Sequence, residues 1–351
     1  MQTDNPIFMK ISVNIIVTAV ALSLATFYGC GGKGHIDYTY PTGGNDATGN
    51  IEVNADGYPQ SIKVVNFTDD LGFSDKCMGW YALIDVNAAD KPVFNVHHQS
   101  PAKTPADIFK DYKAAGKTPY IVTNAGYFWD GKSLSVCIHD SVLESIAAQT
   151  ANATGGVTAY PVRSAFGMKK SGGFEATWVY CPTDGDNKPY SYPSPLDNDE
   201  KAQKYMSAPP SSKTPGAKIW SPKEGIGGGP MLVKDGKNVA FEYYWKEVLE
   251  AGGTLGTSRQ PRTAIGATKD GRIILLVCDG RGMNGSKGYT LKELADKLIS
   301  LGADIAINLD GGGSSTFVGA DGKVKNRPSD SRDSDSIVQR KVPTAIVISA
   351  K

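Results

Sequence analysis

The sequence predicts a protein of the α+β class, in which many short strands are joined by turns. Two local patterns support this class: an apolar hairpin and a strand–helix–strand unit that follows it. The 40 glycines and 20 prolines among 351 residues indicate frequent turns and exclude a helical bundle. No repeat with a period of about 20–50 residues is visible by inspection.

The first pattern is a hairpin around the turn Lys269-Asp270-Gly271. Two apolar-rich runs, Thr263–Thr268 and Arg272–Val277, flank this turn, as the strands of a hairpin do. In an antiparallel hairpin, the start of the first strand lies beside the end of the second. Arg262 is therefore expected close to Asp279.

The second pattern begins with a helix whose first turn carries a capping box, formed by Thr290 and Glu293. Its apolar residues fall on one helical face, and a glycine marks its end. The run Asp304–Leu309 then predicts a short strand. A strand–helix–strand crossover makes its two strands parallel, so their C-terminal ends share one edge of the sheet. Asp279 and Asp310 follow these two ends.

The two patterns together bring four charged side chains to one edge: Arg262, Asp279, Arg281 and Asp310. Ligands bind at such an edge in open parallel sheets. Three glycines, Gly311–Gly313, follow Asp310 and let backbone N–H groups approach a bound anion, and Ser314 and Ser315 add hydroxyl groups. No Gly-Lys-Ser/Thr ending and no GxGxxG run after a strand are present, which argues against ATP and dinucleotide binding.

Two further units fit the same plan. Thr104-Pro105 starts a helix, Tyr120–Thr123 forms the strand after it, and Asn124–Phe128 leaves the C-terminal end of that strand. The glycine-rich run Gly227–Pro230 precedes another short strand, Met231–Lys234, and a turn. Both units therefore add Gly-containing loops to a sheet.

The N-terminus has the features of a secretory signal, which we expect to comprise residues 1–29. Lys10 precedes an apolar run from Ile11 to Tyr28, and small residues close it. Cys30 resembles the lipidation cysteine of bacterial lipoproteins, although an uncleaved anchor helix is the alternative. Residues 30–55 form an expected flexible tether. These features predict a protein of the bacterial cell envelope that is held on a membrane through a lipid anchor.

Length and composition suit one large globular domain or two modest ones. We expect one domain over residues 56–351, with a long loop excursion near residues 182–222. A net charge of +1 gives no basic surface for nucleic acid. The four other cysteines have no CxxC spacing, so a structural zinc site is not expected. Disulfides and free thiols both remain open for them. They are Cys77, Cys137, Cys181 and Cys278.

Two carboxylates, two guanidiniums and a glycine loop suit cleavage of a phosphorylated or glycosidic substrate. Arginine binds phosphate with a planar fork, and paired carboxylates divide the roles of acid, base or nucleophile in glycoside cleavage. The alternative for Arg262 and Asp279 is a structural ion pair that closes the hairpin. A divalent cation, Ca²⁺ or Mg²⁺, is a further alternative, because Asp279, Asp310 and Asn124 offer oxygen donors. No Asp-x-Asp run supports it.

Six stretches of the sequence resemble the phosphodiester glycosidase family, which includes the animal enzyme that removes N-acetylglucosamine from a phosphodiester-linked mannose. They recur in the family order and lie within residues 60–350. The stretches are Asn124–Phe128, Gly227–Gly236, Arg262–Thr263, Asp279–Arg281, Thr290–Ala295 and Asn308–Ser315. Asn326–Asp330 and Arg340 also resemble a family pattern, with the insertion 331–339 between them.

The resemblance implies a central mixed β-sheet flanked by helices in a single catalytic domain. It implies hydrolysis of a glycosyl phosphodiester with release of free sugar, and a phosphorylated glycan or glycosyl phosphodiester as the partner. Asp310 and Asp279 would be catalytic. The implied substrate-binding residues are Arg262, Arg281, Asn124, Gly126, Gly311, Gly312, Gly313, Ser314 and Ser315. Two alternative functions remain: a surface glycan-binding lipoprotein without activity, and a metal-dependent phosphodiesterase.

Overall fold

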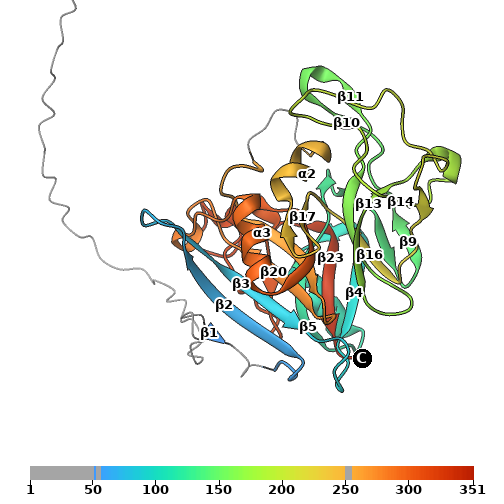
Figure 1. Ribbon diagram of the computed structural model, residues 1–351. Coiled ribbons are helices and arrows are strands. Elements are labelled where there is room, and N and C mark those ends of the chain that lie inside the picture. Colours follow the sequence, from blue (N-terminus) through green and yellow to red (C-terminus); the bar gives the residue numbers. More distant parts are fainter. Residues whose placement is uncertain (1–50, 53–56, 250–254) are drawn as a thin grey trace, which may run out of the picture. The chain divides into compact units, whose positions relative to one another are not determined.

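A computed structural model describes residues 51–52, 57–249 and 255–351 of the chain. The expected signal segment and Cys30 lie outside these residues, as does most of the expected tether. The described part is built mostly from β-sheets and contains three α-helices, α1 (Pro105–Ala114), α2 (Ala240–Lys246) and α3 (Leu291–Ser300) (Figure 1). None of the helices in the described ranges is long and apolar enough to cross a bilayer.

The largest sheet has eight strands and carries the hairpin expected from the sequence. Arg262 lies opposite Cys278, which confirms the register expected for that hairpin. In spatial order the strands are β1 (Ile51–Glu52), β2 (Ile62–Asp70), β3 (Lys76–Ile84), β20 (Ile273–Cys278), β19 (Arg262–Thr268), β21 (Ala303–Asn308), β17 (Met231–Lys234) and β18 (Lys237–Asn238).

The mixed sheet is not confirmed, because the strand pairings of the described residues are antiparallel. β19 lies between β20 and β21 and is antiparallel to both. β20 and β21 therefore run in the same direction without touching. The expectation that their C-terminal ends share one edge is confirmed, although they are not neighbours in the sheet.

A seven-stranded sheet is formed by the middle of the chain. Its order is β15 (Lys218–Ile219), β14 (Tyr190–Tyr192), β13 (Phe174–Tyr180), β12 (Arg163–Met168), β16 (Glu224–Gly227), β8 (Cys137–His139) and β9 (Val142–Ser145). The segment 182–222 supplies β14 and β15, which extend the sheet beyond β13. Part of the predicted loop excursion is thus tied to the sheet by strand pairing.

A four-stranded sheet holds the third unit expected from the sequence. Its order is β22 (Phe317–Val318), β5 (Pro119–Asn124), β23 (Val342–Ser349) and β4 (Val93–Lys103). α1 contacts β5, and Thr104 caps this helix with Pro105 in its first turn, as predicted. Two small hairpins complete the described strands: β6 (Phe128–Trp129) with β7 (Lys132–Ser133), and β10 (Ala151–Asn152) with β11 (Thr158–Ala159).

α3 packs on the large sheet, where it contacts β17, β18 and β21 (Figure 1). Thr290 and Glu293 form the predicted capping box. Leu294 and Leu298 are fully buried, and they belong to a core cluster that also includes Leu276 of β20. Because α3 is held on the sheet by this packing, the point at which the chain enters β21 is fixed as well.

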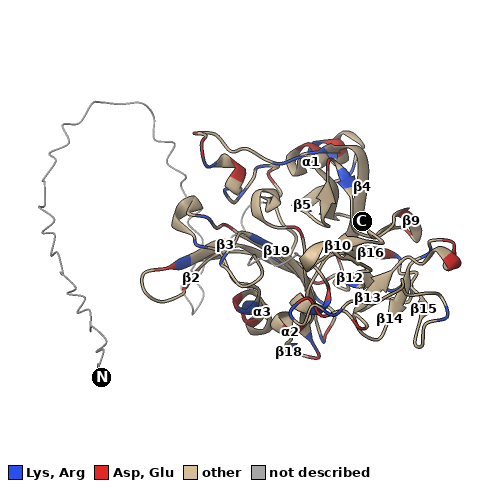
Figure 2. Ribbon diagram, turned by 90° about the horizontal axis from the view of Figure 1, so that it is seen from above, with Lys and Arg blue, Asp and Glu red and all other residues tan. Residues whose placement is uncertain are grey.

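The surface and the cysteines add two simple facts. Figure 2 shows basic and acidic residues interspersed over the described elements, in agreement with a net charge of +1. Cys77, Cys137, Cys181 and Cys278 are free thiols, and all four are buried. The question that the sequence left open is therefore answered for this structure in favour of free thiols.

Replacing Leu294 by alanine tests the helix packing. The variant is expected to lower the free energy of unfolding by about 2–5 kcal/mol, because it leaves a cavity in a closely packed core. Urea denaturation measures this difference. Lys292→Ala, on the exposed side of the same helix, is the matched control and should change the value by less than about 0.5 kcal/mol. Equal effects of the two variants would show that α3 is not packed as described.

Candidate active site

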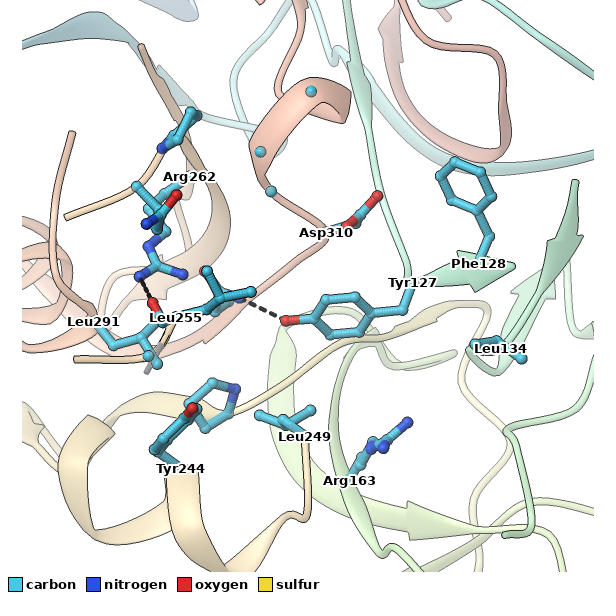
Figure 3. A pocket seen from close by; sticks show the side chains of 18 of the residues that line it. Tyr127, Phe128, Leu134, Arg163, Tyr244, Leu249, Leu255, Arg262, Leu291 and Asp310 are labelled. Atoms are coloured by element: carbon cyan, nitrogen blue, oxygen red, sulfur yellow. Dashed lines mark hydrogen bonds between the residues drawn. The ribbon is translucent and has the colours of Figure 1, made fainter. Parts of the chain in front are cut away.

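A cavity of about 400 Å³ opens where β21 ends and β19 begins. One wall consists of the glycine loop Gly311–Gly313 together with Arg281 and Arg340. Figure 3 shows the ring of Tyr127 between Asp310 and Arg163. The described lining also includes apolar side chains: Phe128, Leu134, Leu249, Leu255 and Leu291.

Asn124, the last residue of β5, joins three segments of the chain behind this cavity. Its Nδ2 donates a hydrogen bond to the carbonyl oxygen of Asp310 (2.6 Å). Its Oδ1 accepts one from the Thr263 hydroxyl (2.8 Å) and one from the Thr316 N–H (3.1 Å). Asn124 is fully buried and is not part of the described cavity lining. The predicted substrate-binding role is therefore corrected: the amide positions the loop that carries Asp310.

Asp310 is half-buried and is the only carboxyl group among the described residues that line the cavity. Its backbone N–H donates to the carbonyl oxygen of Ala125 (2.9 Å), so both sides of its peptide are fixed. Burial raises the pKa of the Asp310 carboxyl to about 6, while a hydrogen bond from Ser314 and the charge of Arg340 oppose this shift. The carboxyl group is thus a stronger base than an exposed aspartate.

The glycine loop is shaped by close contacts, and the N–H groups of Gly311 and Gly312 are engaged by the protein. The N–H of Gly312 donates to the carbonyl oxygen of Pro261 (3.0 Å), so it does not face a ligand. A Cβ atom on Gly313 would collide with the Asp330 carboxylate and the Arg340 guanidinium. Gly312 has φ +62°, which glycine adopts without strain. The expected anion cradle of three N–H donors is therefore corrected. The glycines, which have no side chains, let Arg281 and Arg340 lie against the loop.

Arg281 and Arg340 bring two guanidinium groups to the glycine wall. Arg281 donates from Nε to Gln260 Oε1 (2.9 Å). Burial lowers its pKa, and the nearby charges of Arg332 and Arg340 lower it further. Arg340 forms a two-point ion pair with Asp330, at 2.9 and 2.8 Å. The family pattern that includes Arg340 thus reaches the cavity despite the insertion, and the wall suits an anion.

Arg262 lines the cavity, but its donors are engaged by the protein. Nε donates to the Tyr289 carbonyl (3.0 Å), and Nη2 donates to the carbonyls of Leu255 and Ser258. The side chain is only 7% exposed. The structure gives no Arg262–Asp279 ion pair among its described residues. The predicted phosphate clamp is therefore better described as a buried support of the cavity wall.

Asp279 lies at the predicted edge but outside the described lining of the cavity. Its Oδ1 accepts hydrogen bonds from Asn326 Nδ2 (3.0 Å) and the Arg327 N–H (2.9 Å). Its Oδ2 accepts one from Asn284 Nδ2 (2.9 Å). Burial raises the pKa of Asp279 to about 7. These contacts correct the catalytic assignment: the carboxyl group positions the loop around Asn326.

Three other predicted residues support the site from behind. Ser314 and Ser315 are fully buried and lie outside the described lining. Ser314 stabilises the charged form of Asp310, as noted above, whereas the hydroxyl of Ser315 finds no hydrogen-bond partner within the described part of the chain. Gly126 lets the backbone lie close to Ser135, because a Cβ atom on residue 126 would be only 2.5 Å from Ser135 Cβ.

Two of the three expected cation ligands, Asp279 and Asn124, do not face a metal site. Both Asp279 oxygens and the Asn124 Oδ1 accept hydrogen bonds from donors, which present positive charge where a cation would have to lie. No cluster of three or more His, Cys, Asp or Glu in the described ranges has metal-binding geometry. His97 lies on β4 opposite Ala345, and His139 bonds to Glu224 (3.0 Å), so both belong to sheet contacts.

The sequence analysis assigned no role to several residues of this cavity, and three of them matter for the site: Tyr127, Asn308 and Arg163. Tyr127 donates from its hydroxyl to the Gly229 carbonyl (2.8 Å) and accepts from Asn308 Nδ2 (2.9 Å). Tyr127 and Asn308 lie inside quoted motifs, but neither was assigned a role. Arg163 precedes Ser-Ala-Phe-Gly, and this order resembles the Thr-Ala-Ile-Gly run after Arg262. That similarity was the available signal for Arg163.

Comparison with known families agrees with the resemblance found in the sequence. A family model described as phosphodiester glycosidase matches residues 120–349. The bovine N-acetylglucosamine-1-phosphodiester alpha-N-acetylglucosaminidase is 39% identical over 88 residues, which make up 25% of this chain and 16% of the bovine protein. Its human counterpart is 44% identical over 69 residues, or 20% of this chain and 13% of the human protein. The chain thus aligns with only a small part of these curated relatives.

Solved structures show a similar fold. The catalytic domain of the zebrafish N-acetylglucosamine-1-phosphodiester alpha-N-acetylglucosaminidase, auto-inhibited by its pro-peptide, has a TM-score of 0.58 and 20% identity. The match covers 84% of this chain and 85% of that one. A hypothetical protein from Synechocystis has a TM-score of 0.54 and 17% identity, over 87% of this chain and 64% of the other. At these identities the likeness establishes the fold alone.

Asp279→Asn tests the positioning role of this carboxyl group. A folded pKa of about 7 lies above the unfolded value of about 3.9, so the folded protein binds the extra proton in the interval between them. This group's contribution to stability is therefore present at low pH and is lost as the pH rises toward 7. Asparagine removes that dependence, and it can still accept hydrogen bonds from Asn326 and Arg327.

The measurement is urea unfolding of both proteins from about pH 4 to pH 8. The free energy of unfolding of the variant should fall less steeply with pH than that of the wild type. A slope that Asp279→Asn leaves unchanged would refute a buried, proton-binding Asp279.

Proposed function

Because the chain belongs to the phosphodiester glycosidase family, we propose that it hydrolyses a glycosyl phosphodiester and releases the free sugar. The observation that carries this proposal is the position of Asp310. Its carboxyl group, with a pKa raised to about 6, lies in one cavity with the Arg281–Arg340 wall. A general base and an anion-binding surface therefore face the same volume.

The chemistry of the leaving group explains why one carboxyl group is enough. When the bond between the anomeric carbon and oxygen breaks, the departing phosphate monoester is already an anion, with a second pKa of about 6. It does not need the full protonation that an alcohol needs from a second acid. Guanidinium groups stabilise its charge instead. Arg281 supplies this contact in the proposal, and Arg340 adds positive charge beside it.

Asp310 acts in its ionised form. It takes the proton from a water that attacks the anomeric carbon, or it attacks that carbon itself as the phosphate monoester leaves. In the second case, water then cleaves the glycosyl ester, which releases the sugar and restores the carboxyl group. Its backbone is fixed by Asn124 and Ala125, so little reorganisation is needed when the substrate binds. The Tyr127 ring forms the adjoining wall and is held by hydrogen bonds to Gly229 and Asn308.

Asp310→Asn is expected to lower kcat/KM by about 10²–10⁴-fold or more, because it removes the base without changing the shape of the side chain. Activity is measured as free sugar released from sugar 1-phosphodiesters by a fragment that lacks residues 1–30. In the wild type, kcat/KM should rise with pH through about 6, where Asp310 ionises. Asp279→Asn is the matched control and should keep its activity within about tenfold.

The fold of the Asp310→Asn variant is checked by thermal unfolding. If this variant unfolds, the carboxylate is structural and the assignment fails. Saturable glycan binding with no turnover of any phosphodiester would instead favour a glycan-binding protein. Loss of activity in chelator, restored by Ca²⁺ or Mg²⁺, would favour the metal-dependent phosphodiesterase.

The proposal places the enzyme in the bacterial cell envelope, anchored through a lipid on Cys30. This part rests on the apolar run before that cysteine. Cys30→Ala is expected to move the protein from the membrane fraction to the soluble fraction, because the acyl chains supply the apolar area that holds it there. Fractionation and acyl labelling of both proteins measure this. Unchanged membrane retention without label would support the anchor helix instead.

A further inference from the structure

Arg163 and Arg262 begin two strands with the same residue pattern. Arg163-Ser-Ala-Phe-Gly starts β12, and Arg262-Thr-Ala-Ile-Gly starts β19. Each strand is the first of a hairpin, with Arg163 opposite Val179 and Arg262 opposite Cys278. Both arginines line the candidate cavity.

The third strand of each unit is equivalent as well. Ala165 of β12 lies opposite Gly227 of β16, and Ala264 of β19 lies opposite Asn308 of β21. Just beyond these pairs, the Gly228 N–H donates to the Ser164 carbonyl (2.9 Å). In the other unit the Leu309 N–H donates to the Thr263 carbonyl (2.8 Å). The two units therefore share strand order, register and hydrogen bonding.

The equivalent units meet at their glycine-rich ends. The Gly229 N–H donates to the Asn308 carbonyl (2.8 Å), and the Asn308 N–H donates to the Pro230 carbonyl (3.0 Å). The shared register puts Gly229 where the other unit has Asp310. The cavity thus lies between two related half-sites, and among the described lining residues only the Asp310 half-site contributes a carboxyl group.

The two arginines differ in what holds them. Arg262 donates hydrogen bonds to three backbone carbonyl groups. Arg163 donates from Nε to the Glu247 carbonyl (3.3 Å) and from Nη2 to the Val248 carbonyl (2.6 Å). In the described ranges no ion pair joins Arg163 to a carboxylate, and no hydrogen bond engages its Nη1. The side chain is half-buried.

We propose that Arg163 binds a carboxylate on the sugar, so that the substrate class is the 1-phosphodiester of an acidic sugar. This inference rests on the proposed function. The buried Glu247 carboxyl attracts Arg163 through its charge, but its oxygens accept hydrogen bonds from Ser164, Trp178 and Met231 and form no ion pair with the guanidinium. A partly buried guanidinium without an ion-pair partner has lost hydration, and a ligand carboxylate restores a partner for it. The phosphate occupies the Arg281 wall, and the sugar lies between this wall and Arg163. Gly229 brings no carboxyl side chain to the Arg163 half-site, and the Glu247 Oε2 beside it accepts hydrogen bonds from Ser164.

Arg163 is thus a specificity-determining residue of the cavity. A charged hydrogen bond of this kind changes affinity by about tenfold or more. The test compares the methyl phosphodiesters of glucuronic acid 1-phosphate and galacturonic acid 1-phosphate with those of glucose and galactose, each as both anomers.

The wild type is expected to have a kcat/KM at least about tenfold higher for an acidic sugar than for its neutral counterpart. Arg163→Gln should lose this preference, and Arg163→Lys should keep part of it. Arg272→Gln, which alters an arginine paired with Asp270 at the far end of the β19–β20 hairpin, is the matched control and should keep the full preference. Equal losses on acidic and neutral substrates in Arg163→Gln, or no acidic preference in the wild type, would overturn the inference.

Calorimetric binding of free glucuronate and galacturonate separates this inference from the proposed function. If no phosphodiester is cleaved but uronate binding is present and is lost in Arg163→Gln, the hydrolase proposal fails and the carboxylate site stands. If phosphodiesters are cleaved and uronates bind no better than glucose or galactose, the hydrolase stands and the carboxylate site fails. Should Arg163→Gln not fold, the wild-type comparison of uronates with neutral sugars decides by the same criterion.

Discussion

The hydrogen bonds of Asn124 are the constraint on which the candidate site depends. One carboxamide connects the end of β5 to Thr263 at the start of β19 and to both sides of the glycine loop, at Asp310 and Thr316. These segments come from two different sheets. Because the amide is buried and has both of its ends satisfied by protein groups, the arrangement is costly to change. The backbone of Asp310 is therefore set before any substrate arrives.

Burial and charge then act on Asp310 in opposite directions. Burial raises the pKa of the carboxyl group, and Ser314 and Arg340 limit the rise, so that the group remains ionised near neutral pH while being more basic than an exposed aspartate. Asp330 holds Arg340 in place through a two-point ion pair. The lack of a Cβ atom on Gly313 lets this pair lie against the loop. Three glycines in sequence thus serve side-chain packing as much as ligand approach.

Local patterns predicted much of this arrangement. The turn at Asp270, the register of Arg262 and the capping box of α3 follow from short stretches of sequence, and the structure confirms them. The shared edge of β20 and β21 also follows, because a crossover fixes strand direction. It does not fix strand neighbours, and β19 lies between the two.

The roles of individual side chains were harder to predict. The sequence pattern places Asp279 at the edge of the sheet where β20 ends. Only the structure shows that its carboxyl group accepts hydrogen bonds from Asn284, Asn326 and Arg327 and does not face the cavity. The guanidinium of Arg262 likewise turns to carbonyls that are distant in sequence or lie in loops. Arg163 belongs to a unit related to that of Arg262, but the two units are separated by far more than the period of a simple repeat.

The central claim is that the cavity cleaves the bond between the anomeric carbon and oxygen, with Asp310 as its base or nucleophile and the arginine wall holding the departing phosphate. Hydrolysis in oxygen-18 water tests it most directly, with mass spectrometry of both products. The label is expected on the anomeric oxygen of the released sugar, and the phosphate monoester should carry none. Label on the phosphate would show attack at phosphorus and would contradict this account.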